Sequence, residues 1–203
     1  MEFKKIQLNG FKSFAEKTNF LIEDGLTGIV GPNGCGKSNI VESLRWVMGE
    51  TSAKSMRGSG MEDVIFSGTS NKTSKNIAEV SVSVGNQNNE GPVQYRELDE
   101  IHIRRKIEKD KGSKFYINDK EVRARDAQMF FADLSTGAHS PSMISQGRIG
   151  ALVTAKPTDR RAILEEAAGI SGLHVRRHEA ELRLSAAENN LKRADELRRQ
   201  QEK

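Results

Sequence analysis

The chain has 203 residues, of which 35% are hydrophobic, so it can build one ordinary core plus an appendage but not two independent domains. Its formal charge of +4 permits nucleic-acid binding without arguing for it. A single cysteine, Cys35, excludes an internal disulfide. No signal segment and no apolar run of about 18 residues is present, which predicts a soluble cytoplasmic protein with no membrane partner.

Three short segments near the start have strand character. Residues 3–11 and 18–22 alternate apolar and polar side chains around the turn-like Gly10-Phe11-Lys12-Ser13-Phe14. A third apolar run, residues 26–30, leads directly into a glycine-rich segment. We therefore expect three strands, the last of which directly precedes the glycine-rich segment.

The glycine-rich segment is Gly31-Pro32-Asn33-Gly34-Cys35-Gly36-Lys37-Ser38, which matches the phosphate-binding pattern G-x-x-x-x-G-K-S. Glycines let successive backbone N–H groups turn onto phosphate oxygens, while Lys37 reaches the β- and γ-phosphates and Ser38 ligates Mg²⁺. Apolar residues at helical spacing over 40–48 predict a following helix, whose positive end faces the anion and which Gly49 can close. A glycine-rich turn without a ligand is the alternative interpretation.

Strand periodicity returns after residue 77. Residues 78–84 alternate, and two further strand-like runs, around 101–107 and 115–117, flank the polar residues 109–113. This pattern predicts an antiparallel meander. A short amphipathic helix is expected from Asp126, because apolar residues follow it at helical spacing.

The meander is locally basic. Residues 104–125 contain nine Lys or Arg against four acids, a local excess of +5. This excess fits contact with the phosphates of double-stranded DNA, independent of base sequence. Arg123 and Arg125 alternate onto one strand face and are the residues we assign to DNA; a solvated edge of the meander is the alternative.

A long helix is expected from Pro157, interrupted only by Gly169 and Gly172. With Arg177 counted in the seam, leucine and alanine recur at spacings of four and three between Leu173 and Ala194, which is typical of a coiled coil, while Leu182 and Leu197 lie off that seam. A seam with no second helix to pair with indicates a chain cut from a longer one. We divide the chain into a lobe, 1–170, and a truncated coiled-coil neck, 171–203.

Two further segments match ATPase motifs only in part, and we do not assign them a function. Residues 129–133 look like an apolar strand ending in a Mg²⁺-supporting carboxylate, but their periodicity is helical. Leu134-Ser135-Thr136-Gly137 has only one of the two glycines of an L-S-G-G signature. We therefore expect the chain to lack a metal-supporting acid, a general base and a signature motif.

Five motifs follow one another along the whole chain. They are Gly10-Phe11-Lys12-Ser13-Phe14, Gly31-Pro32-Asn33-Gly34-Cys35-Gly36-Lys37-Ser38-Asn39, Lys54-Ser55-Met56-Arg57-Gly58, Ile144-Ser145-Gln146-Gly147-Arg148 and Arg161-Ala162-Ile163-Leu164-Glu165-Glu166-Ala167-Ala168-Gly169-Ile170. Together they resemble the N-terminal head lobe of bacterial SMC (structural maintenance of chromosomes) proteins. The first two motifs are shared with other ABC-class repair ATPases, whereas the last two are more specific to SMC proteins.

This resemblance implies an α/β fold: an ABC-type P-loop ATPase head lobe, with a mixed sheet, an antiparallel meander and the start of a coiled-coil arm. It implies ATP and Mg²⁺ as cofactors, with Lys37, Gln146 and Arg57 as the catalytic residues. Gln146 matches the glutamine loop, which meets Mg²⁺ and the attacking water, so Ser38 and Gln146 are the expected metal ligands. Arg57 matches an arginine finger loop near the phosphates. The expected nucleotide contacts are Lys12, Ser13, Pro32, Asn33, Gly34, Cys35, Gly36, Lys37, Ser38 and Asn39.

The resemblance also implies partners. They are the C-terminal head lobe of the same protein, a second SMC head in a homodimer, a kleisin subunit at the neck helix, and double-stranded DNA in the nucleoid. The chain would be the ATP-binding half of a chromosome-organising ATPase and nearly inactive alone. Three alternatives stay open: a RecN-like or zinc-hook repair ATPase, a self-sufficient P-loop phosphotransferase, and a coiled-coil scaffold with a degenerate loop.

Overall fold

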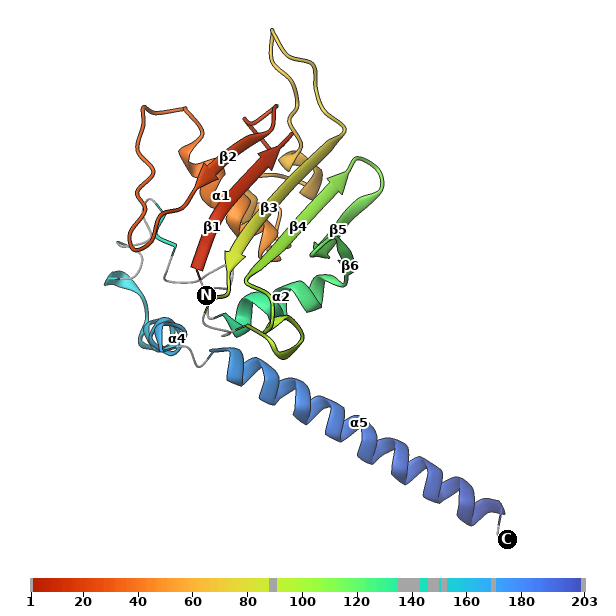
Figure 1. The fold of residues 1–203 in the computed structure, drawn as a ribbon. Coiled ribbons are helices and arrows are strands. Elements are labelled where there is room, and N and C mark those ends of the chain that lie inside the picture. The colour runs from red at the N-terminus through yellow and green to blue at the C-terminus, as the bar shows by residue number, and fades with distance from the viewer. Residues whose placement is uncertain are drawn as a thin grey trace.

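A six-stranded sheet forms the centre of the structure, a computed structural model that describes residues 2–87, 91–134, 143–145, 150, 153–168 and 171–201 (Figure 1). The spatial order of the strands is β2-β1-β3-β4-β5-β6. Their bounds are β1 Glu2–Asn9, β2 Thr18–Leu21, β3 Ile77–Gly85, β4 Glu100–Glu108, β5 Gly112–Ile117 and β6 Lys120–Val122. The predicted meander is confirmed as β3 to β6. Every pair of neighbouring strands among the described residues is antiparallel, where a mixed sheet was expected.

The strand predicted at residues 26–30 is wrong for the described chain. No strand occupies this run, and Leu26 and Val30 are 96% and 92% exposed. A strand needs a neighbour to satisfy its backbone N–H and C=O groups, and none of the described strands offers it one. The apolar run therefore enters the glycine loop as exposed, irregular chain.

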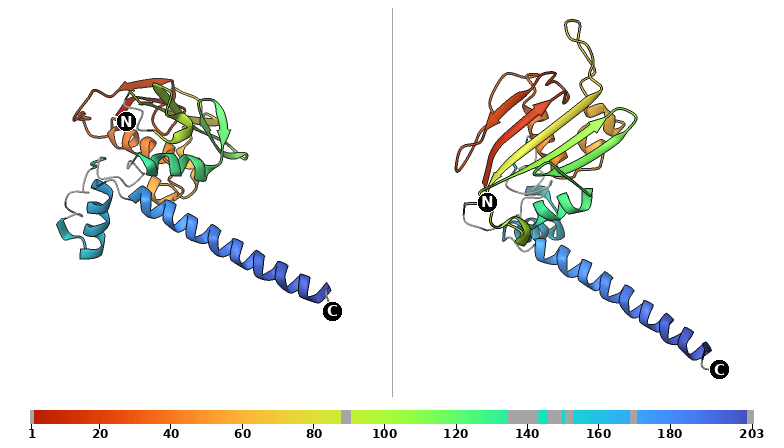
Figure 2. Two further views of the ribbon diagram at one scale, coloured as in Figure 1. Left: turned by 60° about the horizontal axis from the view of Figure 1, so that its bottom comes forward. Right: turned by 45° about the vertical axis from the view of Figure 1, so that its right-hand side comes forward.

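The helices are α1 Lys37–Val47, α2 Ala124–Asp133, α4 Pro157–Ala167 and α5 Ser171–Gln201. Three short 3₁₀ turns, Lys54–Met56, Met61–Val64 and Val93–Tyr95, lie in the connections. α1 and α2 cover the same face of the sheet (Figure 2). The expected helix over 127–134 is confirmed, because Ala127, Phe130 and Phe131 turn one buried side of α2 toward the lobe.

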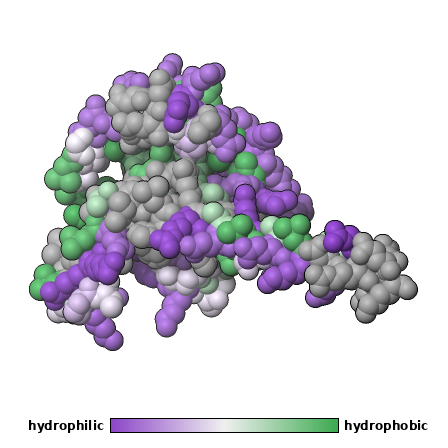
Figure 3. Space-filling model, turned by 90° about the horizontal axis from the view of Figure 1, so that it is seen from below, coloured by the Kyte–Doolittle hydropathy of each residue, from purple (hydrophilic) through white to green (hydrophobic). Residues whose placement is uncertain are grey.

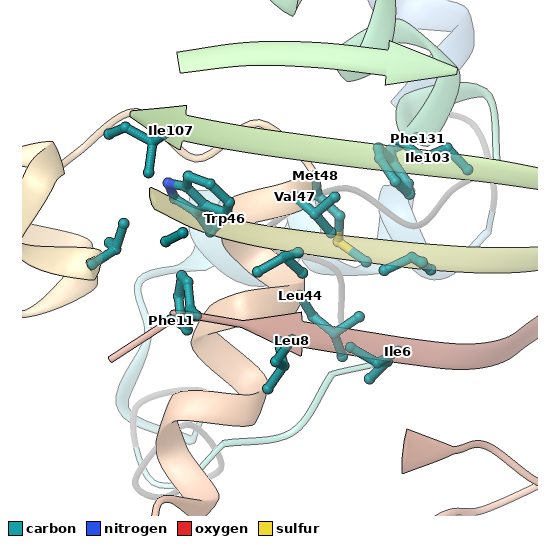
Figure 4. Close-up of a cluster of buried hydrophobic side chains, with 14 of the residues drawn as sticks. Ile6, Leu8, Phe11, Leu44, Trp46, Val47, Met48, Ile103, Ile107 and Phe131 are labelled. Atoms are coloured by element: carbon teal, nitrogen blue, oxygen red, sulfur yellow. The ribbon is translucent and has the colours of Figure 1, made fainter. Parts of the chain in front are cut away.

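The hydrophobic core lies between α1 and the inner face of the sheet. Leu44 of the helix lies beside Leu8 and Ile6 of β1, and Trp46 lies near Ile107 of β4 (Figure 4). Such burial stabilises the fold by about 1.5–3 kcal/mol for each large apolar side chain. The core therefore fixes α1 against the strands, and with it the glycine loop that precedes the helix.

One charged side chain belongs to this core. Alternation along β4 places Arg105 on the same inner face as the buried isoleucines, and it is only 3% exposed. Its guanidinium lies between the rings of Trp46 and Phe115, 4.5 and 4.6 Å from their centroids. Nη1 donates to the carbonyls of Trp46 and Glu50, both at 2.7 Å, and Nε donates to Ser113 Oγ at 2.7 Å.

Arg105 thereby closes the C-terminal end of α1. The last carbonyls of a helix have no partner within the helix, and a cation there also meets the negative end of the helix dipole. Burial lowers the pKa of Arg105 to about 10, an effect partly offset by the Glu50 carboxylate, so the group stays charged at neutral pH.

α5 leaves the lobe as a long straight rod (Figures 1 and 2). Its described leucines Leu182, Leu184 and Leu191 are more than half exposed. Seen from below, hydrophobic patches lie among hydrophilic side chains along this helix (Figure 3). Within the described ranges, none of the helices combines the length and apolar content that a lipid bilayer requires.

Replacing Arg105 by methionine is expected to reduce the free energy of unfolding by about 2–5 kcal/mol, because the buried guanidinium's hydrogen bonds to the carbonyls of Trp46 and Glu50 and to Ser113 are then lost. Urea titration followed by circular dichroism measures this loss. Arg104→Met is the matched control. Arg104 is the neighbour of Arg105 on β4 but faces the other side of the sheet, where it pairs with Glu79 and Asp119. That change should cost less than about 1 kcal/mol. Equal losses in the two variants would contradict a special role for Arg105.

Candidate nucleotide-binding site

The glycine loop stands exposed at the N-terminal end of α1. Gly34 and Gly36 have φ angles of 82° and 92°, in the left-handed region that favours glycine. Gly36 is the N-cap residue directly before α1, and a Cβ there would lie 2.8 Å from Ser13 Oγ. Both the backbone angle and the close approach of Ser13 therefore require glycine at position 36.

The loop presents positive charge to solvent. The first four N–H groups of a helix have no partner within it, and the first turn of α1 has no acidic residue to cap them. Lys37 Nζ folds back over the loop and donates to the carbonyls of Gly31 and Pro32 at 2.6 and 2.5 Å. Cys35 is exposed, with its Sγ 3.9 Å from the same ammonium. Such an arrangement of amides and a lysine binds phosphate.

A second segment, the turn after β1, lies against the first turn of α1. Asn39 Nδ2 donates to Ser13 Oγ at 2.8 Å. Lys12 Nζ donates to Glu42 Oε2 and to the carbonyl of Met56. The turn that carries Lys12 and Ser13 is thereby joined to both the helix and the following connection.

A third segment brings Arg57 to the same place. Its Nη2 donates to Asn39 Oδ1 at 3.0 Å, and its Nε pairs with Glu42 Oε1 at 2.5 Å. The Arg57 side chain is still 58% exposed. The structure therefore brings Lys12, Ser13, Lys37, Asn39 and Arg57 together around the start of α1. Sequence reasoning missed Glu42; the available signal was an acid one helical turn after Asn39, inside an apolar run.

Residues 2–149 match the family model for the RecF/RecN/SMC N terminal domain. The chain belongs to this family.

Individual relatives are SMC proteins. The Chromosome partition protein Smc of Rhodopseudomonas palustris (strain ATCC BAA-98 / CGA009) is 55% identical over 197 residues, which are 97% of this chain but 17% of that protein. A solved structure described as "Structural biochemistry of ATP-driven dimerization and DNA stimulated activation of SMC ATPases" has a TM-score of 0.71 and 29% identity, covering 82% of this chain and 99% of that one. The Smc head domain with an extended coiled coil bound to the C-terminal domain of ScpA, derived from Pyrococcus furiosus, has a TM-score of 0.74 and 32% identity, covering 96% and 48%.

These matches confirm the predicted resemblance to SMC head lobes and the α/β, ABC-type fold class. They favour an SMC protein over a RecN-like one, because relatives that are 55% and 56% identical to this chain carry the Smc name. They leave the role of each site residue as a prediction.

Gln146, the predicted glutamine-loop residue, lies outside the described residues of this SMC-family chain. Its neighbour Ser145 is described, and Ser145 Oγ accepts a hydrogen bond from Arg45 Nη2 of α1 at 3.1 Å. The chain therefore reaches the last turn of α1 one residue before Gln146.

The expected Mg²⁺ ligand Ser38 is exposed in the first turn of α1. The described residues contain no group of three or more His, Cys, Asp or Glu that could hold a metal by themselves. Mg²⁺ is usually held by one or two protein oxygens together with substrate phosphates and water. A single serine hydroxyl beside a phosphate loop fits that mode of binding, whereas an all-protein metal cage does not.

The prediction that Arg123 and Arg125 share a strand face is wrong. β6 ends at Val122, Arg123 precedes α2, and Arg125 lies in its first turn. The reason is Asp126, whose carboxylate accepts the backbone N–H of Arg123 at 3.2 Å and caps the helix. Arg123 is therefore an extended residue before the helix and Arg125 a helical one, so the two do not alternate along one strand. Both remain exposed.

The basic stretch is also less free than its composition predicts. Arg105 is buried, and Arg104, Lys111 and Lys114 pair with acids. An open groove remains beside these residues, where Lys120 and Arg123 contribute to the lining.

Proposed function

We propose that this chain is the ATP-binding N-terminal half of an SMC ATPase head, with ATP and Mg²⁺ as cofactors, acting in chromosome condensation and segregation. The observation that carries the proposal is the arrangement around α1, where the glycine loop, Lys12, Ser13 and Arg57 converge on one helix end. Residues 1–170 are the proposed head lobe and 171–203 the proposed neck. A cytoplasmic, nucleoid-associated location follows from this function.

The proposed chemistry is mainly positioning and electrostatic stabilisation of the transferred phosphoryl group. Lys37 and the loop amides hold the phosphates, and Arg57 adds positive charge from the side of α1. Bound Mg²⁺ would neutralise phosphate charge, with Ser38 and Gln146 as its protein ligands. Gln146 is further proposed to orient the attacking water.

A single lobe does not complete this site. The one buried carboxylate described beside the first turns of α1, Glu42, is held by Lys12 and Arg57 and is therefore not proposed as a general base. The exposed apolar run around Leu26, Ile29 and Val30 enters the loop without a neighbour. We infer that the C-terminal head lobe of the same protein covers this run and supplies the base. A second head in a homodimer supplies the signature motif, in keeping with the ATP-driven dimerization named for a related structure.

Two further partners are proposed. The P. furiosus relative is a complex with the C-terminal domain of ScpA, which supports a kleisin partner. We place the amino-terminal helices of the kleisin on α5, where Leu182 is 56% exposed. The second partner is double-stranded DNA, held through its backbone by Arg123 and Arg125. Both residues lie exposed beside the groove that Lys120 helps to line.

The isolated chain should bind Mg-ATP but hydrolyse it far below about 1 s⁻¹, the low end of ordinary enzymes. Lys37→Ala should weaken binding about 100-fold, because charge-assisted bonds to phosphate are lost. Calorimetry and a phosphate-release assay measure the two quantities. Lys75→Ala, which removes an exposed lysine elsewhere, is the control and should bind normally. ATP turnover near 1 s⁻¹ by the chain alone would refute the proposal that it holds only half of the catalytic site.

Arg123→Glu with Arg125→Glu should weaken binding to duplex DNA at low salt by at least about tenfold, irrespective of base sequence. Fluorescence anisotropy over a salt series measures affinity and the salt slope. Lys192→Glu with Arg193→Glu, two exposed cations of α5, makes the same change in net charge and should leave affinity within about twofold. If both double variants lose the same amount of DNA affinity, the loss reflects net charge alone, which would count against a DNA-binding surface at Arg123 and Arg125.

Leu182→Glu with Leu197→Glu should weaken capture of the kleisin's amino-terminal helices about tenfold or more, because a helix packed there would bury the new charges. A pull-down titration measures capture, and calorimetry checks that ATP binding is unchanged. Leu184→Glu with Leu191→Glu changes the coiled-coil seam instead and should spare capture. If the first pair captures the kleisin as well as wild type does, the docking site lies elsewhere.

A further inference from the structure

A buried carboxylate lies behind the proposed nucleotide site. Glu42 of α1 is only 6% exposed, and burying a charged carboxylate is costly unless it is paired and hydrogen-bonded. Each of its oxygens has its own cation: Oε2 accepts from Lys12 Nζ and Oε1 pairs with Arg57 Nε. The single acid therefore joins two loops that are 45 residues apart in the sequence to one helix.

The two cations differ in exposure. The Lys12 side chain is 14% exposed, so it forms a fixed, internal pair with Glu42. The Arg57 side chain is 58% exposed, and only its Nε faces the carboxylate. Its Nη2 donates to Asn39 Oδ1, one turn earlier on α1. This side-on arrangement directs the outer end of the guanidinium away from Glu42, toward the start of the helix where phosphate would bind.

Lys12 and Arg57 also share an unusual backbone. Their φ angles are 46° and 54°, in the left-handed region that costs a non-glycine residue about 1 kcal/mol or more. The other described non-glycine residues with positive φ are Asp110, Asn118 and Asp119, residue types that tolerate this region in turns. Among the described residues, the two lysine or arginine residues in this region, Lys12 and Arg57, both contact Glu42. Such strain persists where surrounding contacts impose it.

We propose that Glu42 is a positioning residue for Arg57. It holds the 3₁₀ turn that precedes Arg57 against α1 and fixes the guanidinium by its Nε, so that the remaining N–H groups are set for a nucleotide phosphate before the nucleotide arrives. Lys12 neutralises the other oxygen and keeps the carboxylate from repelling the phosphate. This inference rests on the proposed ATP site and assigns that site a residue whose own side chain touches no phosphate.

The test is a double-mutant cycle on Mg-ATP affinity, with Glu42→Gln, Arg57→Ala and the double variant of the 203-residue chain. Glu42→Gln keeps the shape and removes the charge. It should weaken binding about tenfold in the wild-type background and less than about twofold when Arg57 is already alanine. A merely structural role would lower the melting temperature without this dependence on Arg57. Glu79→Gln, which removes a carboxylate paired with Arg104 on the sheet, is the matched control and should leave affinity unchanged.

The outcomes separate the two hypotheses. If the wild-type chain binds Mg-ATP no better than Lys37→Ala, the proposed function fails. If wild type binds but Glu42→Gln binds equally well, or loses the same factor with and without Arg57, the positioning role is overturned. If Glu42→Gln does not fold, amide hydrogen exchange is measured in Arg57→Ala instead. The amide of Gly58 donates to the carbonyl of Ala53, and it should exchange about tenfold faster once the ion pair between Arg57 and Glu42 is lost. Unchanged exchange would overturn the proposal.

Discussion

The position of helix α1 is the constraint on which the rest of the structure depends, and buried charge fixes that position as much as apolar packing does. At its C-terminal end, Arg105 reaches from β4 to the carbonyls of Trp46 in the helix and Glu50 just beyond it, and lies between two aromatic rings. Nearer its start, Glu42 pairs with Lys12 and Arg57. A buried ion or guanidinium accepts only a few geometries, whereas apolar contacts tolerate sliding. The helix is therefore held in both rotation and translation relative to the sheet.

This constraint explains how segments distant in the sequence form one site. The turn after β1, the glycine loop and the connection after α1 each contact the first turns of the same helix. None of these segments has extensive secondary structure of its own, so their geometry comes from what they touch. A loop whose residues converge on a rigid helix presents a preorganised surface to a ligand, and preorganisation reduces the cost of binding. The site is thus a property of α1 and its neighbours together.

Local patterns predicted well those features that local physics determines. The alternation over 78–84 became β3, the helical spacing of Ala127, Phe130 and Phe131 became α2, and the glycine loop precedes a helix as its motif requires. Features that depend on a distant or absent neighbour were predicted poorly. Residues 26–30 have strand character but no partner strand in the described chain. Arg123 was assigned to a strand because the capping role of Asp126 was overlooked. Glu42 and Arg105 look like ordinary surface charges until the fold places them inside.

The long helix α5 gives the lobe a mechanical property that its core does not have. A helix of 31 residues is about 46 Å long, and its base lies against α2. Over that length, a rotation of about 10° at the base displaces the far end by about 8 Å. α2 in turn packs on β5, a neighbour of the strand that carries Arg105. A rotation at the base of α5 that is too small to disturb the packing of the lobe therefore moves the far end of the helix by more than the length of a side chain. The helix thus amplifies small rearrangements of the lobe into large displacements at its tip.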